Sequence, residues 1–354
     1  MTLDRYVFKL LLVRTVFAAV ALIGLIQVIE LLDVTTALLE RGLGLAGIAR
    51  YSLLRLPGMF QQIAPLSVLI GAIFTFTQLA RNSEMVVIRA TGANIYRVLK
   101  MMIPVALGVA ALDFAVAAEV APHTQDALRK WMDATAPASK VKAPKPHWFR
   151  LGRDLVLVTR ISADGTRMEG VRIYLRDQNA ALTQEIAAPS ATAQPGGWRL
   201  HDATVSRITG DRASLTLPAD RDWATRLKPE DVVRLFRAGD DISAGAALNA
   251  LSSTGPQNRS PGFYQTRLHR TFAEPLAALV MLLLSAPAAL ASLRSDQGMR
   301  LMLFGLASGL LFLVVDGLLT ALGETSALPP LLAAWSAPVT FAALAMTVLF
   351  YVEG

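Results

Sequence analysis

The residues best suited to a function are carboxylates that interrupt long apolar stretches of the chain. Five lie within or at the edges of such stretches: Glu30, Asp113, Glu119, Glu274 and Asp316. An ionisable group at membrane depth is costly, and it usually lines a water-filled cavity or a transport pathway. A position at the membrane interface would also explain Glu30, Glu119 and Glu274. These side chains therefore predict a cavity that is wet or lined by lipid headgroups toward one side.

A second candidate group lies between two apolar stretches, in the segment 81–93, which reads RNSEMVVIRATGA. Ser83 can cap a short helix, and Glu84 then lies in its first turn, where the helix dipole favours an acid. Gly92 suits the C-terminal end of this helix. The helix would turn apolar side chains to a partner protein or to the inner leaflet, and both readings stay open: Met85, Val86 and Ile88.

The sequence contains few of the residues that catalysis or metal binding requires. It has no cysteine, which excludes disulfides, thiolate catalysis and cysteine metal sites. It has no phosphate-binding G-x-x-x-x-G-K-[ST] motif, no H-E-x-x-H and no G-x-S-x-G, so we expect neither ATP hydrolysis nor a cofactor on this chain. Four histidines are far apart in the sequence: His123, His147, His201 and His269.

The composition is that of a membrane protein. Of 354 residues, 53% are hydrophobic and 17% are charged, whereas soluble domains have about 25% charged residues. The net charge of +7 comes without a basic run that alternates with aromatics, so nucleic-acid binding is not expected. Membrane topology and anionic lipid account for the basic excess.

Six apolar stretches exceed the roughly 20 residues that a bilayer requires: 8–32, 56–80, 99–120, 271–293, 300–322 and 328–351. An even number of spans places both termini on one side. Lys and Arg flank the apolar stretches on the side where both termini lie. The short loops on the other side contain only three basic residues: Arg41, Arg50 and Arg55. The positive-inside rule therefore predicts cytoplasmic termini.

The segment 121–265 separates the third and fourth stretches and reads as strands. Val171, Ile173 and Leu175 alternate with polar residues, so we expect them on the apolar face of a strand. Turn residues recur at the spacing of a sandwich or jelly roll. The predicted fold is an α+β membrane protein with three helices at 1–120, a β-jelly-roll-like domain at 121–265 and three helices at 266–354.

The segment 81–92 resembles the coupling-helix signature of the LptF/LptG permeases, which extract lipopolysaccharide from the inner membrane. The resemblance extends over the chain, and the opening and the fifth span are more similar to the LptG branch than to the LptF branch. Further similar segments are Leu3-Asp4-Arg5-Tyr6, Leu56-Pro57, Val120-Ala121-Pro122, Trp198-Arg199-Leu200, Val315-Asp316 and Leu328-Pro329-Pro330.

The resemblance implies the permease subunit of an ABC transporter in the bacterial inner membrane, with the β-domain in the periplasm. Its implied partners are an LptF-type paralogue, LptC, an LptA-type periplasmic bridge and two copies of the LptB ATPase, which would hold ATP and magnesium. The ATPase-coupling residues would be Arg81, Glu84, Arg89 and Gly92, with Glu84 as the acid that pairs with a basic residue of the ATPase.

The chain departs from the family where lipid would bind. Some relatives carry lysines where Glu30, Thr36, Ala37 and Gly58 stand here, whereas a basic residue matches at Arg129. Either other arginines bind phosphate (Arg41, Arg50, Arg55 and Arg129) or the headgroup is less anionic. The predicted lipid-cavity or headgroup residues are Glu30, Arg55, Asp113, Arg129, Lys130 and Asp316. A membrane-anchored periplasmic scaffold without transport activity is the alternative function.

Overall fold

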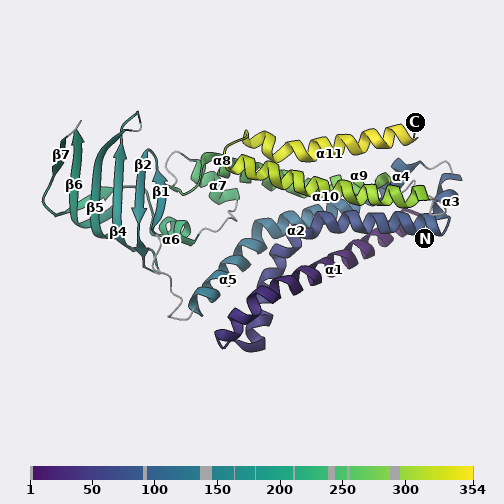
Figure 1. The fold of residues 1–354 in the computed structure, drawn as a ribbon, viewed down its shortest axis with the longest axis horizontal. Helices are drawn as coiled ribbons and strands as arrows, with labels where there is room; N and C mark the ends of the chain where they lie inside the picture. Colours follow the sequence, from purple (N-terminus) through teal and green to yellow (C-terminus); the bar gives the residue numbers. More distant parts are fainter. Residues whose placement is uncertain are drawn as a thin grey trace. The chain divides into compact units, whose positions relative to one another are not determined.

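The computed structural model describes residues 3–90, 94–135, 146–162, 164–179, 181–209, 212–237, 244–252, 256–287 and 296–353. The chain forms two compact units, one of Met1–Pro137 with Thr266–Gly354 and one of Ala138–Gln265. The first unit is helical and the second contains the sheet (Figure 1).

The division between the units falls after the boundary expected at residue 120. Helix α4 (Ile95–Ala115), the π-helix η1 (Val116–Val120) and helix α5 (Ala121–Ala134) follow one another without a break. The helical rod therefore continues well past the end of the expected third span, and α5 packs against α2 (Gly44–Arg81).

Five helices of the helical unit are long and apolar enough to cross a membrane: Leu3–Glu40, Gly44–Arg81, Ile95–Met132, Arg300–Glu324 and Pro330–Tyr351. They belong to α1 (Leu3–Glu40), α2, the α4–α5 rod, α10 (Asp296–Glu324) and α11 (Pro330–Glu353). Five of the six expected spans thus correspond to such helices.

The expected fourth span, 271–293, is not one continuous helix. Helix α8 (Pro261–Ala273) passes into a 3-10 turn η3 (Glu274–Leu276), and α9 (Ala277–Leu284) follows. Pro275 lies in η3, and a proline inside a helix removes a hydrogen bond and clashes with the preceding turn. Residues 288–295 lie outside the described part of the chain, so a sixth span stays a prediction.

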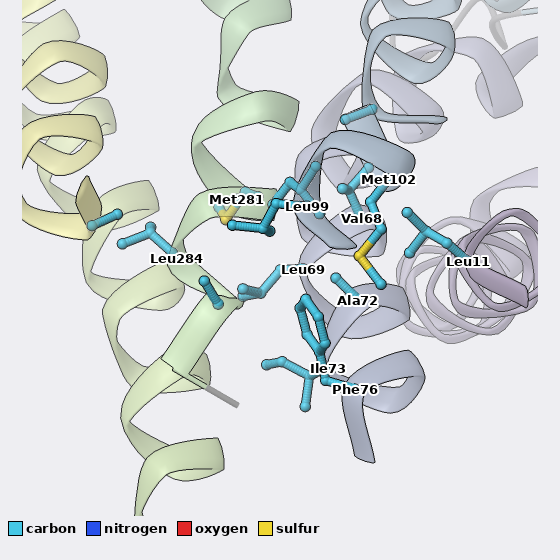
Figure 2. Close-up of a cluster of buried hydrophobic side chains, with 14 of the residues drawn as sticks. Leu11, Val68, Leu69, Ala72, Ile73, Phe76, Leu99, Met102, Met281 and Leu284 are labelled. Carbon is cyan, nitrogen blue, oxygen red and sulfur yellow. The ribbon is translucent and has the colours of Figure 1, made fainter. Parts of the chain in front are cut away.

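The core of the helical unit surrounds α9. Met281 of α9 lies beside Leu99 of α4 in Figure 2, and Leu69 of α2 and Leu284 of α9 belong to the same buried cluster. Glycines allow the closest approaches: a Cβ added at Gly71 would lie 2.6 Å from the hydroxyl of Thr15 on α1. Small residues at helix contacts are typical of membrane proteins.

The outer faces of α1, α10 and α11 are apolar. Phe17 and Leu32 of α1 are each 75% exposed, and Val314 of α10 is 68% exposed. A water-soluble protein rarely exposes such continuous apolar surface. The start of α1, the end of α11 and the short helix α3 (Glu84–Ala90) lie at one end of the helical unit (Figure 1).

The second unit is built on one antiparallel sheet in the order β7-β6-β5-β4-β2-β1-β9, in which β3 also pairs with β4 and β8 with β6. Helices α6 (Pro229–Arg237) and α7 (Ala244–Leu251) lie between β8 and β9 in the chain. The strands are β1 (His147–Leu151), β2 (Asp154–Val158), β3 (Arg160–Ile161), β4 (Arg167–Arg176), β5 (Leu182–Gln194), β6 (Gly197–Thr209), β7 (Arg212–Leu215), β8 (Ala219–Ala224) and β9 (Pro256–Gln257).

The side chains of β4 expected on one apolar face lie at the core of the sheet. Val171 and Ile173 are fully buried, and Leu175 packs against the same core. Trp198 of β6 is also fully buried, and its indole Nε1–H donates to the carbonyl of Leu227 over 2.8 Å. The strands join in a single hydrogen-bonded sheet, so the antiparallel β-domain is established while its jelly-roll arrangement stays a prediction.

Candidate functional site

The short helix α3 is attached to α1 through the side chain of Glu84. Oε1 of Glu84 accepts from the phenol of Tyr6 over 3.2 Å and from Nδ2 of Asn82 over 2.9 Å. Ser83 has a φ of 57°, whereas an N-cap residue is typically extended. Its carbonyl, which accepts from the N–H of Val86 over 3.1 Å, begins the helix.

Helix α3 divides its apolar side chains between the core and the surface. Met85 and Ile88 are 6% and 4% exposed and belong to the core of the helical unit, whereas Val86 and Val87 are 68% and 64% exposed. Of the three apolar residues expected to face a partner or the inner leaflet, only Val86 is exposed, and the neighbouring Val87 is exposed as well. Among the other predicted coupling residues, Arg81 is exposed.

Two of the predicted coupling residues lie partly or wholly outside the residues that the structure describes. Arg89 belongs to α3, but its side chain is outside the described part, and so is Gly92 altogether. Of the predicted coupling residues whose side chains the structure describes, Arg81 is thus exposed and Glu84 is partly buried, and the valines Val86 and Val87 are exposed beside them.

A second polar group, the Glu30 cluster, joins α1 to α2 toward the end opposite α3. Nε of Arg55 donates to Oε1 of Glu30 over 2.6 Å, and the phenol of Tyr51 donates to the same oxygen over 2.9 Å. About one turn earlier on α1, Gln27 donates to the hydroxyl of Ser52 over 2.9 Å. We define the Glu30 cluster as these five residues, and its net formal charge is zero.

Other basic residues near the α1–α2 connection also have partners within the chain. Arg41 donates to the carbonyl of Met132, 2.9 Å away near the end of α5. The guanidinium of Arg50 lies over the ring of Trp131, 5.3 Å from its centroid. On α5, Lys130 pairs with Asp126 over 2.6 Å, and Arg129 is exposed.

Asp113 is the most deeply buried of the candidate carboxylates. It is 3% exposed, and its Oδ1 has no hydrogen-bond partner among the residues that the structure describes. It lies on α4 just before the π-helix η1, and α4 packs against η3, the turn that contains Glu274. π-helical turns inside helices frequently mark functional sites.

Asp316 belongs to a third polar group, which the sequence did not reveal. Nη1 of Arg270 lies 2.8 Å from Oδ2 of Asp316, and Nη2 lies 3.6 Å from Oε1 of Glu274. Arg267, one turn earlier, lies 2.9 Å from Glu324. Arg267, Arg270 and Glu274 recur at helical spacing, so their common face was a signal that sequence reasoning could have used.

The predicted lipid-site residues thus fall into separate groups. Arg55 pairs with Glu30. Asp316 pairs with Arg270, and Asp113 lies on α4, which packs against the turn that contains Glu274. Lys130 pairs with Asp126 along α5. Glu119 is largely exposed and lies 3.9 Å from His123. Charge balances within the Glu30–Arg55 and Asp126–Lys130 pairs, whereas Arg270 is shared by the two carboxylates of Asp316 and Glu274.

Sequence comparisons place the whole chain in one family. The profile described as "Lipopolysaccharide export system permease LptF/LptG" matches residues 5–351. The lipopolysaccharide export system permease protein LptG of Escherichia coli K12 is 25% identical over 98% of this chain and 97% of its own length. The LptG protein of Haemophilus influenzae is 23% identical over 99% of this chain and 96% of its own length.

Proposed function

Because the chain belongs to the LptF/LptG family of lipopolysaccharide export system permeases, we propose that it is the transmembrane permease subunit of an ABC transporter. It extracts lipopolysaccharide from the inner membrane and passes the lipid to a periplasmic bridge for outer-membrane assembly. The observation that carries this proposal is the match over nearly the full chain, together with the names of the relatives.

In this proposal a separate LptB-type subunit hydrolyses ATP, and α3 transmits the movement of that subunit to the membrane-spanning helices. The exposed pair Val86–Val87 supports this role, because an apolar pair on the surface of a short connecting helix suits a groove in a partner. Burial of Met85 and Ile88 in the core supports it as well, since a push on α3 would then reach α2 and α4.

The transporter assembles from this chain, an LptF-type paralogue, two LptB-type ATPases, LptC and an LptA-type bridge. The termini and α3 face the cytoplasm, and the β-domain lies in the periplasm. The position of both chain ends near α3 supports this topology (Figure 1), as does the distribution of Lys and Arg. Acyl chains contribute most of the lipid affinity, about 0.8 kcal/mol for each buried methylene.

A membrane-anchored scaffold without transport activity is the second candidate. The observation that favours it is the Arg270–Asp316 pair, since a carboxylate that is engaged within the chain can serve stability alone.

Affinity purification from the native membrane tests the proposal. The detergent-solubilised chain should bring down an ATP-binding subunit, a paralogue with similar spans and lipopolysaccharide, all identified by mass spectrometry. A chain carrying Val87→Asp, which changes only the exposed face of α3, should lose the ATPase and retain the paralogue. An intact, monodisperse sample without ATPase or lipid would support the scaffold instead.

A further inference from the structure

The basic groups near the α1–α2 connection are already engaged within the chain. Arg55 is held by a carboxylate, Arg41 by the carbonyl of Met132, and Arg50 by the face of Trp131. On α5, Lys130 is held by Asp126. A phosphate that bound at Arg55 would have to displace Glu30 or approach it closely, and like charges at such a distance repel.

The Glu30 cluster offers a different kind of recognition. Its side chains comprise a carboxylate, a guanidinium, a phenol, an amide and a hydroxyl, and it has no net formal charge. Arg55 and Glu30 remain 33% and 20% exposed, so both can still contact a ligand. Paired donors and acceptors of this kind can bind hydroxyl groups, which donate and accept at once.

Gly58 of α2 lies beside this arrangement, and a side-chain carbon there would make only ordinary van der Waals contact with it. A Cβ at this position would lie 3.8 Å from Nη1 of Arg55 and 3.7 Å from Nε2 of Gln125 on α5. The Arg55 guanidinium therefore lies along the surface of α2, with its Nε toward Glu30 and its Nη1 toward Gly58. Its Nη groups are the part of the cluster that can still donate to a ligand.

We infer that the Glu30–Arg55 pair makes this permease selective for a lipid whose headgroup presents uncharged, hydroxyl-rich sugar at this position rather than phosphate. This inference rests on the proposed function, because it assumes that a saccharolipid enters the helical unit. Glu30 acts as the specificity-determining residue: its carboxylate accepts from sugar hydroxyls, and it keeps Arg55 from pairing with a phosphate.

A binding comparison with two lipid probes tests the inference on the purified complex. The probes are a bis-phosphorylated lipid A and the same lipid A with both phosphates removed. The wild-type complex should bind the dephosphorylated probe more tightly. Glu30→Gln keeps an acceptor for Tyr51 but frees Arg55. It should shift the preference toward the phosphorylated probe by about tenfold, because the freed guanidinium can form charge-assisted hydrogen bonds to a phosphate.

Asp33→Asn is the matched control, because Asp33 is an exposed acid one turn further along α1. It should change the preference by less than about threefold, the effect of a screened surface charge. Wild-type preference for the phosphorylated probe, or equal shifts in both variants, would overturn the inference while leaving the proposed function intact. Failure of the wild-type complex to bind either probe would count against the proposed function itself.

Discussion

Arg270 and Asp316 form an ion pair that joins α8 to α10, with 2.8 Å between Nη1 and Oδ2. Their side chains are only 14% and 16% exposed, so water screens the pair weakly. The same guanidinium lies 3.6 Å from Glu274, at the point where the helix breaks into η3. The ion pair thus holds α8 in place where the chain lacks a continuous helix.

Loss of the Arg270 cation should destabilise the helical unit. Arg270→Gln leaves Asp316 and Glu274 without their counter-charge, and it should lower the free energy of unfolding by about 3 kcal/mol. Adding Asp316→Asn should recover part of this loss. Unfolding in detergent, followed by tryptophan fluorescence, measures both variants.

The exposed pair of Arg160 and Glu169, 3.5 Å apart, provides the control for that measurement. Arg160→Gln should cost less than about 1 kcal/mol, as surface ion pairs do. Equal losses for Arg160→Gln and Arg270→Gln would contradict a stabilising role that depends on burial.

Close packing of α1 on α2 should depend on Gly71. Gly71→Ala would place a Cβ 2.8 Å from the backbone nitrogen of Thr15, so α1 must move, at a cost of about 1–3 kcal/mol. Gly24→Ala on α1 meets nothing within 4 Å, and it should be neutral or stabilising because alanine favours a helix. The temperature of thermal unfolding should therefore fall for Gly71→Ala, and it should rise or stay unchanged for Gly24→Ala.

Reversal of charge at Glu84 should uncouple the ATPase. Glu84→Arg removes the oxygen that accepts a hydrogen bond from Tyr6, and it brings a cation toward the basic residue expected on the partner. Glu84→Gln keeps an uncharged oxygen that can still accept from Tyr6. Breaking such a partly buried pair from one side costs roughly 3–5 kcal/mol, so Glu84→Arg should lose the ATPase in a pull-down. Glu230→Arg, an exposed acid of the β-domain, is the control; normal ATPase yield and stimulation with Glu84→Arg would refute the coupling role.

The fold was predictable from sequence where one physical signal dominates. Length and apolarity locate the spans, and period-2 alternation places Val171 and Ile173 in the core of the sheet. The break at Pro275 escaped prediction because membrane helices often tolerate proline. Whether a helix bends, breaks or continues at such a proline depends on the helices packed around it.

The candidate sites were less predictable, because charge pairing depends on three-dimensional contacts. The sequence identifies Asp316 only as an isolated carboxylate, because its partner Arg270 lies 46 residues earlier in the chain. In the same way, composition places Met85 and Val86 together on α3, yet only one of them is exposed. A helix of seven residues is too short for its periodicity to fix which face is buried.

The core of the β-domain should depend on Trp198. Trp198→Phe removes the donor to the Leu227 carbonyl, and an unsatisfied buried acceptor costs about 1–3 kcal/mol; Trp198→Ala should cost about 3–5 kcal/mol, since it also leaves a cavity. Trp223 on the neighbouring strand is only partly buried, so Trp223→Phe should cost less. Limited proteolysis of the membrane-embedded protein ranks the three variants, and equal resistance of Trp198→Ala and Trp223→Phe would contradict this assignment.

The turn between β3 and β4 should loosen only in strong acid. Hydrogen bonds from the hydroxyls of Ser162 and Thr166 and from the N–H of Thr166 lower the pKa of Asp164 from 3.8 to about 2. The unfolded carboxyl takes up its proton first as the pH falls, so the stabilisation is complete above about pH 4 and is lost as the pH falls through 2. Amide exchange at Thr166, corrected for its intrinsic rate, should therefore be equally protected at pH 7 and pH 5 and less protected at pH 2. In Asp164→Asn the protection should not change over this range, and a loss already at pH 5 in the wild type would show that another group controls the turn.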